Sequence, residues 1–231
     1  MSRWIFVKQA GAPEFEFVDS AGSSVQHYTS GTRSYAITHA CDSAATYLVL
    51  TGTSSSGASY NRLTGCTINS VSATLAAQFG SATSKVTNLD RSSTAMYYAT
   101  GITGASLNID TTWTGGNVFR STVQVYKIAK ASISVHDTAT DSGVDSDTTG
   151  SVTLDVPESG LVFALSCGVT DTTTPSFGST LTLDDTTTTN QYIINACGSK
   201  VGGGNGYTIT GTSLSDGVAA STFRLLAVSI V

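Results

Sequence analysis

The sequence predicts an all-β protein built from two tandem antiparallel β-sandwiches, and three observations support this prediction. First, only 12% of the 231 residues are charged, and the polar remainder is mostly Thr, Ser, Gly and Asn. Strand surfaces accept Thr and Ser readily, whereas helix surfaces usually draw on Glu, Lys, Arg and Gln. Second, short apolar runs alternate with turn-rich stretches, and no segment holds apolar residues at helical spacing for three turns. Third, the chain repeats itself.

The repeat consists of three pairs of segments that occur in the same order in both halves. These are "DSAATYLVLTG" (42–52) with "ESGLVFALSCG" (158–168), "MYYATG" (96–101) with "IINACG" (193–198), and "STVQVYKIA" (121–129) with "STFRLLAVS" (221–229). The order predicts two copies of one unit, residues 32–130 and 148–231. The second copy is shorter, and most of the missing residues are expected in the loop after Gly52. Each unit is expected to be a sandwich of the jelly-roll or Ig-like type, with the jelly-roll favoured.

Ahead of the first unit, residues 1–31 are predicted to form an N-terminal β-hairpin arm. Two apolar runs in "WIFVKQAGAPEFEFVD" are separated by Ala-Gly-Ala-Pro. Trp4, Phe6, Phe15 and Phe17 would leave too much apolar area on an isolated hairpin. We therefore expect these four residues to bind either the chain's own sandwich or a neighbouring chain, and they are the predicted partner-binding residues.

Within the units, "TYLVL" and "LVFALS" are continuous apolar runs, which indicate strands covered on both faces or a sandwich interior. In "NVFRSTVQVYKIA", Val123 and Val125 alternate with Gln124 and Lys127, which predicts one face on a core and leaves Tyr126 as a further candidate for that face. The other expected strands are "SVSATLAAQF", "TAMYYATG" and "ASLNIDTTW" in the first unit, and "STLTLDD", "NQYIINACG" and "GYTITGTSL" in the second. Residues 131–147 are polar and acidic and are predicted to be a linker, with the option of a short strand at its start.

The charge and cysteine content exclude several classes of protein. A net charge of -5 without a basic cluster argues against binding nucleic acid. No early apolar run is long enough for a signal peptide or a membrane-spanning helix. We therefore expect that the protein is made in a cytoplasm and does not insert into a membrane. Cys41, Cys66, Cys167 and Cys197 form no C-x-x-C pair and are expected to be buried, reduced thiols. Their even number leaves disulfides open, with three connectivities that the sequence does not rank.

The sequence offers no convincing catalytic motif. It has three histidines and no G-x-S-x-G, and the glycine-rich stretch 202–206 lacks the helix and lysine of a phosphate site. The carboxylate pairs Glu14 with Glu16 and Asp184 with Asp185 are too close in sequence to converge across a cleft. We therefore expect a protein that is not an enzyme and needs no cofactor.

Two kinds of binding site have candidates. Asp141, Asp145 and Asp147, together with His136, supply ligands for calcium within a short segment, although the D-x-D-x-D-G spacing is missing. Candidate glycan contacts are Tyr60, Trp113 and Tyr207, which lie in or near expected loops where a ring can stack on a sugar. The alternative for these aromatic residues is that they shield the end of a sandwich.

The segments "ESGLVFALSCGVTDTTTPSF" and "STFRLLAVSIV", with the glycine-rich hairpin between them, resemble the tandem β-sandwich modules of tailed-phage virion proteins. These modules occur in capsid decoration or cement proteins, head fibres and tail-tip adhesins. The resemblance covers both units and depends on pattern rather than on a diagnostic signature. It implies a place in the virion after synthesis in the host cytoplasm, other virion proteins such as major capsid or fibre proteins as partners, and a homo-oligomer, commonly a trimer.

Two functions fit this resemblance. A decoration protein or head-fibre component would bind and stabilise neighbouring capsid subunits, through the N-terminal arm or by strand addition at sheet edges. The alternative is a tail or fibre adhesin that binds host-surface carbohydrate with loops of the second unit, 168–179 and 199–206. The sequence favours the first function.

Overall fold

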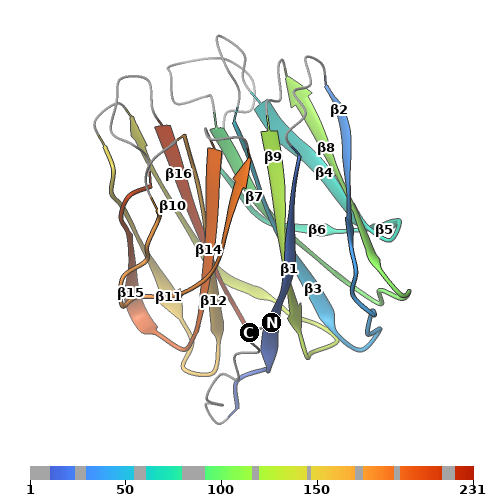
Figure 1. Cartoon of the computed structure of the whole chain (residues 1–231). Coiled ribbons are helices and arrows are strands. Elements are labelled where there is room, and N and C mark those ends of the chain that lie inside the picture. Colours follow the sequence, from blue (N-terminus) through green and yellow to red (C-terminus); the bar gives the residue numbers. More distant parts are fainter. Residues whose placement is uncertain are drawn as a thin grey trace.

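The computed structural model contains only strands and their connections in the part of the chain that it describes (Figure 1). The described residues are 11–23, 30–54, 61–79, 92–115, 120–144, 147–169, 174–189, 193–214 and 222–231. Within them, 16 strands form four sheets, and every paired strand runs antiparallel to its neighbour. The predicted all-β class is confirmed.

The first half of the chain folds into two facing sheets. The large sheet contains, in spatial order, β1 (Phe15–Ser23), β9 (Arg120–Ile128), β3 (Thr46–Ser54), β7 (Ser92–Thr100) and β6 (Thr74–Phe79). The small sheet contains β2 (Gly31–Ile37), β8 (Leu107–Gly115), β4 (Asn61–Ile68) and β5 (Val71–Ser72). Tyr47 and Val49 of the large sheet pack against Ile109 and Trp113 of the small one, so the two sheets enclose the core of a sandwich.

The second half repeats this arrangement. Its large sheet contains β10 (Val135–Val144), β16 (Thr222–Ile230), β12 (Leu161–Val169), β14 (Ile193–Val201) and β13 (Thr182–Thr189). Its small sheet contains β11 (Gly150–Val156) and β15 (Gly204–Gly211). In both large sheets the last strand of the half lies between the first and the third strand of that half: β9 lies between β1 and β3, and β16 lies between β10 and β12. Among the described residues, the counterpart of β4 is reduced to an isolated bridge between Ser176 and Thr212, and β5 has no counterpart. The predicted shortening after Gly52 is therefore only half of the difference, since the interval between β6 and β7 is shortened equally in the second half.

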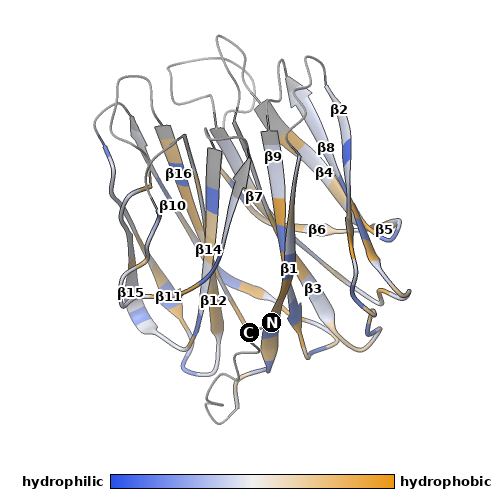
Figure 2. Ribbon diagram, in the orientation of Figure 1, coloured by the Kyte–Doolittle hydropathy of each residue, from blue (hydrophilic) through white to orange (hydrophobic). Residues whose placement is uncertain are grey.

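The two large sheets pack face to face and share a third hydrophobic core. Leu48 and Tyr126 from the first half meet Phe163 and Leu226 from the second. The ring centroids of Tyr126 and Phe163 are 4.8 Å apart. Each large sheet is therefore covered on both faces, which explains the continuous apolar runs in β3 and β12 (Figure 2).

The two halves are related by an approximate two-fold axis that runs along the strands. β3 lies against β12, β1 against β13, and β6 against β16 and β10. Near the ends of β12 and β3, the Cys167 thiol donates to the Thr53 carbonyl at 3.5 Å, so these two strands run in the same direction. Reciprocal contacts of this kind are those of an isologous dimer interface. The duplicated chain thus folds like a dimer of its own halves.

The structure corrects the predicted alignment of 42–52 with 158–168. That alignment places Leu48 over Ala164, but Leu48 faces the shared core whereas Ala164 faces the core of the second sandwich. A shift of one residue exchanges the two faces of a strand. The alignment is therefore wrong by one position. Phe163, which also faces the shared core, is the residue of β12 that corresponds to Leu48 of β3.

The second half of the predicted N-terminal arm is an edge strand. Phe15–Ser23 forms β1, which pairs with β9 of the first large sheet. The Phe15 ring is 5.5 Å from that of Phe163, and the Phe17 ring is 5.4 Å from that of Tyr126. These two phenylalanines therefore pack within their own chain instead of forming a free partner-binding surface. Trp4 and Phe6 lie outside the described residues.

The predicted linker, 131–147, is wrong over most of its length. Val135–Val144 forms β10, which pairs along its length with β16 at the edge of the second large sheet. Side chains on this strand alternate between half-buried and exposed positions over residues 135–140, as expected where only one face of a strand is covered. His136, Thr138 and Thr140 occupy the exposed face of this edge strand. Asp137 and Asp141 are half-buried and accept backbone hydrogen bonds from β11.

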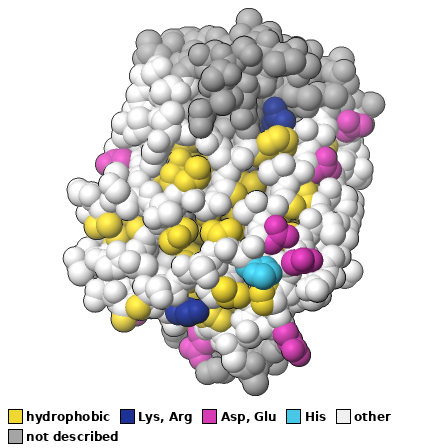
Figure 3. Space-filling view, turned by 180° about the vertical axis from the view of Figure 1, so that it is seen from behind, with side chains coloured by type: hydrophobic (Ala, Val, Ile, Leu, Met, Phe, Trp, Pro, Cys, Tyr) yellow, Lys and Arg dark blue, Asp and Glu magenta, His cyan; other side chains and the backbone are white. Residues whose placement is uncertain are grey.

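The described surface is mostly uncharged. Figure 3 shows one face on which most atoms belong neither to charged nor to hydrophobic side chains, while hydrophobic side chains gather near its middle. The large hydrophobic side chains that are exposed among the described residues are Val71, Leu75 and Leu183. The described part of the chain contains no helix of the length and hydropathy needed to cross a membrane.

Candidate functional site

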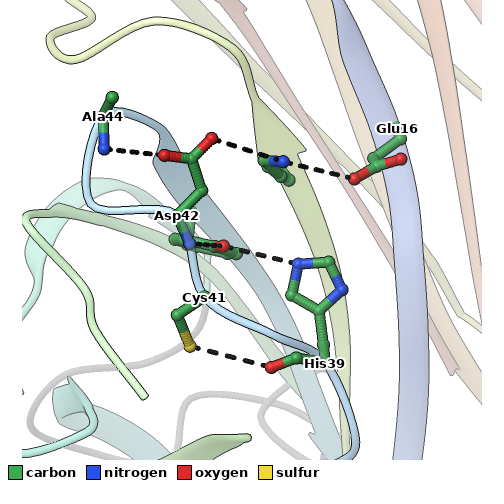
Figure 4. A network of polar contacts seen from close by, with 7 residues as sticks. Glu16, His39, Cys41, Asp42 and Ala44 are labelled. Carbon is green, nitrogen blue, oxygen red and sulfur yellow. Dashed lines mark hydrogen bonds and ion pairs between the residues drawn. The ribbon is translucent and has the colours of Figure 1, made fainter. Parts of the chain in front are cut away.

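A network of polar side chains joins the loop 38–45 to the edge of the first large sheet (Figure 4). Lys127 Nζ on β9 lies 3.5 Å from Asp42 Oδ2 and 3.7 Å from Glu16 Oε1 on β1. About half of each carboxylate side chain is exposed, so water and salt weaken these ion pairs. They fix the position of the loop and contribute less than about 1 kcal/mol each.

Tyr47 on β3 is the centre of this network. Its hydroxyl accepts a hydrogen bond from the Asp42 backbone N–H at 2.8 Å and lies 3.4 Å from His39 Nε2. Burial raises the pKa of Tyr47 and lowers the pKa of His39. At neutral pH both side chains are therefore uncharged, and the phenol can donate a hydrogen bond to the imidazole while keeping its proton.

The neighbouring thiol is not an activated nucleophile. Cys41 Sγ lies 3.4 Å from the Ser106 carbonyl and 3.5 Å from Asn69 Nδ2. Burial raises the pKa of the Cys41 thiol, so the reactive thiolate is scarce at neutral pH. The arrangement of His39, Cys41 and Tyr47 therefore holds the loop in place and has no group poised for covalent chemistry.

We expect Tyr47→Phe to lower the free energy of unfolding by about 1–2 kcal/mol, because it keeps the buried ring but leaves the Asp42 N–H without its acceptor. Chemical denaturation of the two proteins measures the difference. Lys127→Met serves as the comparison and should cost less than about 1 kcal/mol, since its ion pairs are partly exposed. A smaller loss from Tyr47→Phe than from Lys127→Met would contradict the central role of Tyr47.

A second polar cluster lies between the two large sheets and links the two halves of the chain. Tyr126 on β9 donates a hydrogen bond to Asp184 Oδ2 on β13 at 2.7 Å, and Ser199 on β14 donates to the same oxygen at 2.5 Å. Cys197 Sγ lies 3.1 Å from the Tyr126 hydroxyl. Burial raises the pKa of the Asp184 carboxyl above its usual 3.8, although both hydrogen bonds act in the opposite direction.

The raised pKa of Asp184 predicts a pH dependence of stability. An acid whose pKa is higher in the folded state binds its proton more tightly there, so its contribution to stability is present at low pH. That contribution is lost as the pH rises from about 4 through the folded pKa. Since Asp184→Asn cannot ionise, we expect the variant to gain stability relative to the natural chain as the pH increases towards 7.

Urea denaturation at a series of pH values measures this difference. The titratable groups that face Asp184 are Asp185, Cys197 and Tyr126. All three are present in both the variant and the natural chain, so the comparison isolates Asp184. Glu158→Gln, in the exposed turn after β11, controls for the loss of one negative charge. A relative stability that falls with pH would mean that Tyr126 and Ser199 stabilise the carboxylate more than burial destabilises it.

The two predicted glycan contacts that the structure describes, Trp113 and Tyr207, belong to different sandwiches. Trp113 is only 1% exposed in the core of the first sandwich, where its Nε1 donates to Thr111 Oγ1, so it cannot stack on a sugar. The Tyr207 hydroxyl is hydrogen-bonded to the Thr180 carbonyl and accepts from Lys200 Nζ at 2.8 Å. Tyr60 lies outside the described residues. The alternative, that these rings shield the end of a sandwich, stays a prediction.

The predicted calcium ligands are only partly described, because Asp145 lies outside the described residues. Asp141 uses both carboxylate oxygens to accept backbone N–H groups, from Ser142 at 2.8 Å and from Ser151 at 2.7 Å. Among the described residues, no three His, Cys, Asp or Glu side chains are grouped as metal ligands. His136 on β10 and Asp147 are both exposed.

The four cysteines are free thiols in the structure. Cys66, Cys167 and Cys197 are buried, as predicted, whereas Cys41 is partly exposed. Burial raises the pKa of both Cys66 and Cys167 to about 12. These buried thiols behave as small hydrophobic side chains.

Asp184 and Asp185 lie together at a β-bulge in β13, between Leu183 and Asp185. Asp184 accepts from Tyr126, while Asp185 Oδ2 accepts from Thr187 at 2.6 Å and lies 3.5 Å from Gln124 Nε2, so both carboxylates face β9. Glu16 binds Lys127, as described above. Sequence reasoning missed Tyr126 and Asp184 as partners, since they are 58 residues apart and no motif connects them.

The comparisons with known proteins do not identify a family. The chain matches no protein-family model, and no curated protein matches it.

Proposed function

We propose that this protein is a non-enzymatic structural component of a tailed-phage virion, of the capsid decoration, cement or head-fibre kind, which binds and stabilises neighbouring capsid subunits. The observation that carries the proposal is the shared core: two sandwiches of the same strand order are joined back to back by Leu48, Tyr126, Phe163 and Leu226. Such a body is rigid and presents related surfaces on its two outer sides. This suits a clamp between repeated neighbours.

We propose that the contacts use the sheet faces and the connections rather than strand addition. All four edge strands of the large sheets contain a β-bulge, and bulges discourage pairing with a further strand. The outer surfaces offer Thr and Ser hydroxyls with few charges, for example Thr153 and Thr208, which pair at 2.9 Å across the exposed face of β11 and β15. Broad, uncharged contacts of this kind would tolerate changes of ionic strength.

We further propose that each unit is a jelly-roll rather than an Ig-like sandwich. The order β1-β9-β3-β7 in one sheet and β2-β8-β4-β5 in the other supports this, because the chain crosses repeatedly between sheets, as interleaved Greek keys require. The second half has the corresponding orders β10-β16-β12-β14 and β11-β15.

The alternative function, a carbohydrate-binding adhesin, has less support. Its two predicted binding loops, 168–179 and 199–206, leave neighbouring antiparallel strands at opposite ends, since β12 ends at Val169 where β14 begins, and β14 ends at Val201. The two loops approach each other again, because the Thr180 carbonyl just after the first is hydrogen-bonded to Tyr207 just after the second. The buried position of Trp113 is what reduces the candidate contacts for a glycan.

Virions that lack this protein test the proposal. We expect them to lose DNA at a lower temperature than complete virions, and we expect quantitative mass spectrometry of purified particles to find hundreds of copies of the chain. Purified chain should bind empty capsids and ignore a glycan array. A handful of copies per particle together with binding to a sugar would favour the adhesin, and turnover of a polysaccharide would contradict both functions.

A further inference from the structure

The shared core changes from apolar to polar along the strands. At the level of Leu48 and Phe163 the contacts are aromatic and aliphatic. Further along β3, at Gly52, the residues that face the other sheet are Thr122 of β9 and Thr94 of β7, both paired with Gly52. Facing them are Asn195 of β14 and its neighbours in the second large sheet. Asn195 and both threonines are 0% exposed.

Several polar atoms in this layer have no hydrogen-bond partner among the described residues. They are both side-chain atoms of the Asn195 amide, the hydroxyls of Thr94 and Thr122, and Oε1 of Gln124. Gln124 reaches from the first large sheet to the second, since its Nε2 donates to the Asn195 backbone carbonyl at 3.1 Å. Thr122, Gln124 and Asn195 therefore lie on one side of Gly52, and Thr94 lies on the other.

Gly52 makes space for the Asn195 amide. A Cβ atom added to Gly52 would overlap Asn195 Oδ1 and lie 3.0 Å from the Cys167 Cβ. On the far side of Cys167, the Arg224 guanidinium lies 4.5 Å from the centre of the Phe79 ring and is only 5% exposed. The layer is thus buried, polar and crowded. It contains more hydrogen-bond donors and acceptors than the described protein groups around them can satisfy.

We propose that this layer is a binding site for ordered water between the two sandwiches, held by the Asn195 amide, the Thr122 hydroxyl and Gln124 Oε1. Leaving a polar group buried without a partner costs about 1–3 kcal/mol, so five such atoms in one layer would be a heavy penalty. Buried water commonly makes two to four hydrogen bonds to groups of this kind. The polar half of the interface is then bridged by water, and the apolar half is dry.

A crystal structure of the full chain at about 1.8 Å resolution provides the first test. The expected result is electron density for water within hydrogen-bonding distance of Asn195 and Thr122. If no water lies there, for example because the Asn195 amide donates to Gln124 Oε1, the proposal is overturned. It is also overturned if the density belongs to an ion or a larger molecule beside Arg224.

Matched threonine variants provide the second test. Thr122→Val removes a hydroxyl that would bind the water, and we expect the folding equilibrium constant to fall roughly tenfold. Thr51→Val is the control. The Thr51 hydroxyl is also buried and has no hydrogen-bond partner in the described part of the chain, but Thr51 lies between Val123 and Ala95 on the opposite face of the sheet. Removing an isolated buried hydroxyl should leave stability unchanged or raise it. Equal effects of the two variants would overturn the proposal.

Discussion

Phe163→Ala should lower the free energy of unfolding of the whole chain by about 3–5 kcal/mol. Phe163 is fully buried in the shared core, where its ring lies 4.8 Å from that of Tyr126 and 5.5 Å from that of Phe15. Truncation leaves a cavity between the two sheets, which are each held rigid by their own sandwich. Although Phe163 belongs to the second half, the loss should therefore appear in the first half as well.

Tryptophan fluorescence can measure this effect, since Trp4 and Trp113 are the only tryptophans and both belong to the first half. We expect the midpoint of their unfolding transition in urea to fall in the Phe163→Ala variant. Leu183→Ala, at an exposed position in the second half, should leave that midpoint almost unchanged. A tryptophan transition that does not respond to Phe163→Ala would show that the halves unfold independently.

Gly168→Ala should destabilise the second sandwich by about 3 kcal/mol or more, at the upper end of the range for overpacking. A Cβ atom at this position of β12 would overlap the backbone carbonyl oxygen of Leu214 and lie 2.9 Å from its carbon. Leu214 cannot move away easily, because its side chain is buried in the second core and its N–H donates to the Thr148 carbonyl at 2.9 Å. The segment after β15 must therefore separate from β12.

Thermal unfolding followed by circular dichroism tests this prediction. The matched control is Gly65→Ala in β4, where the nearest atom to an added Cβ is 4.0 Å away, on Thr112. We expect the control to change the stability by less than about 1 kcal/mol. Similar midpoints for the two variants would contradict the close approach of Leu214 to Gly168.

The strand content and the duplication could be predicted from the sequence because both depend on local patterns. Turn residues separate short apolar runs, and the same order of segments occurs twice. The face of each strand was harder to predict, since in β3 both Leu48 and Val49 are buried, in different cores. A run that is apolar on both faces contains no alternation to fix its orientation.

Two errors have other physical causes. The linker prediction is wrong for β10 because an edge strand needs only one apolar face, and the exposed positions of β10, such as Thr138 and Thr140, are polar. Trp113 is wrong as a glycan contact near a loop, because it ends the expected strand "ASLNIDTTW" and the alternation of Leu107, Ile109 and Trp113 along β8 indicates that it faces inward. The polar cluster at Asp184 gave no signal, since it exists only where the two halves meet.

Native-state hydrogen exchange, measured for each backbone amide, tests the shared core most directly. The central strands β3 and β9 of the first half and β12 and β16 of the second lie on either side of this core. If the duplicated halves form one cooperative unit, their slowest amides should exchange with the same free energy of opening, equal to that of global unfolding. Two distinct opening free energies, one for each half, would contradict the account.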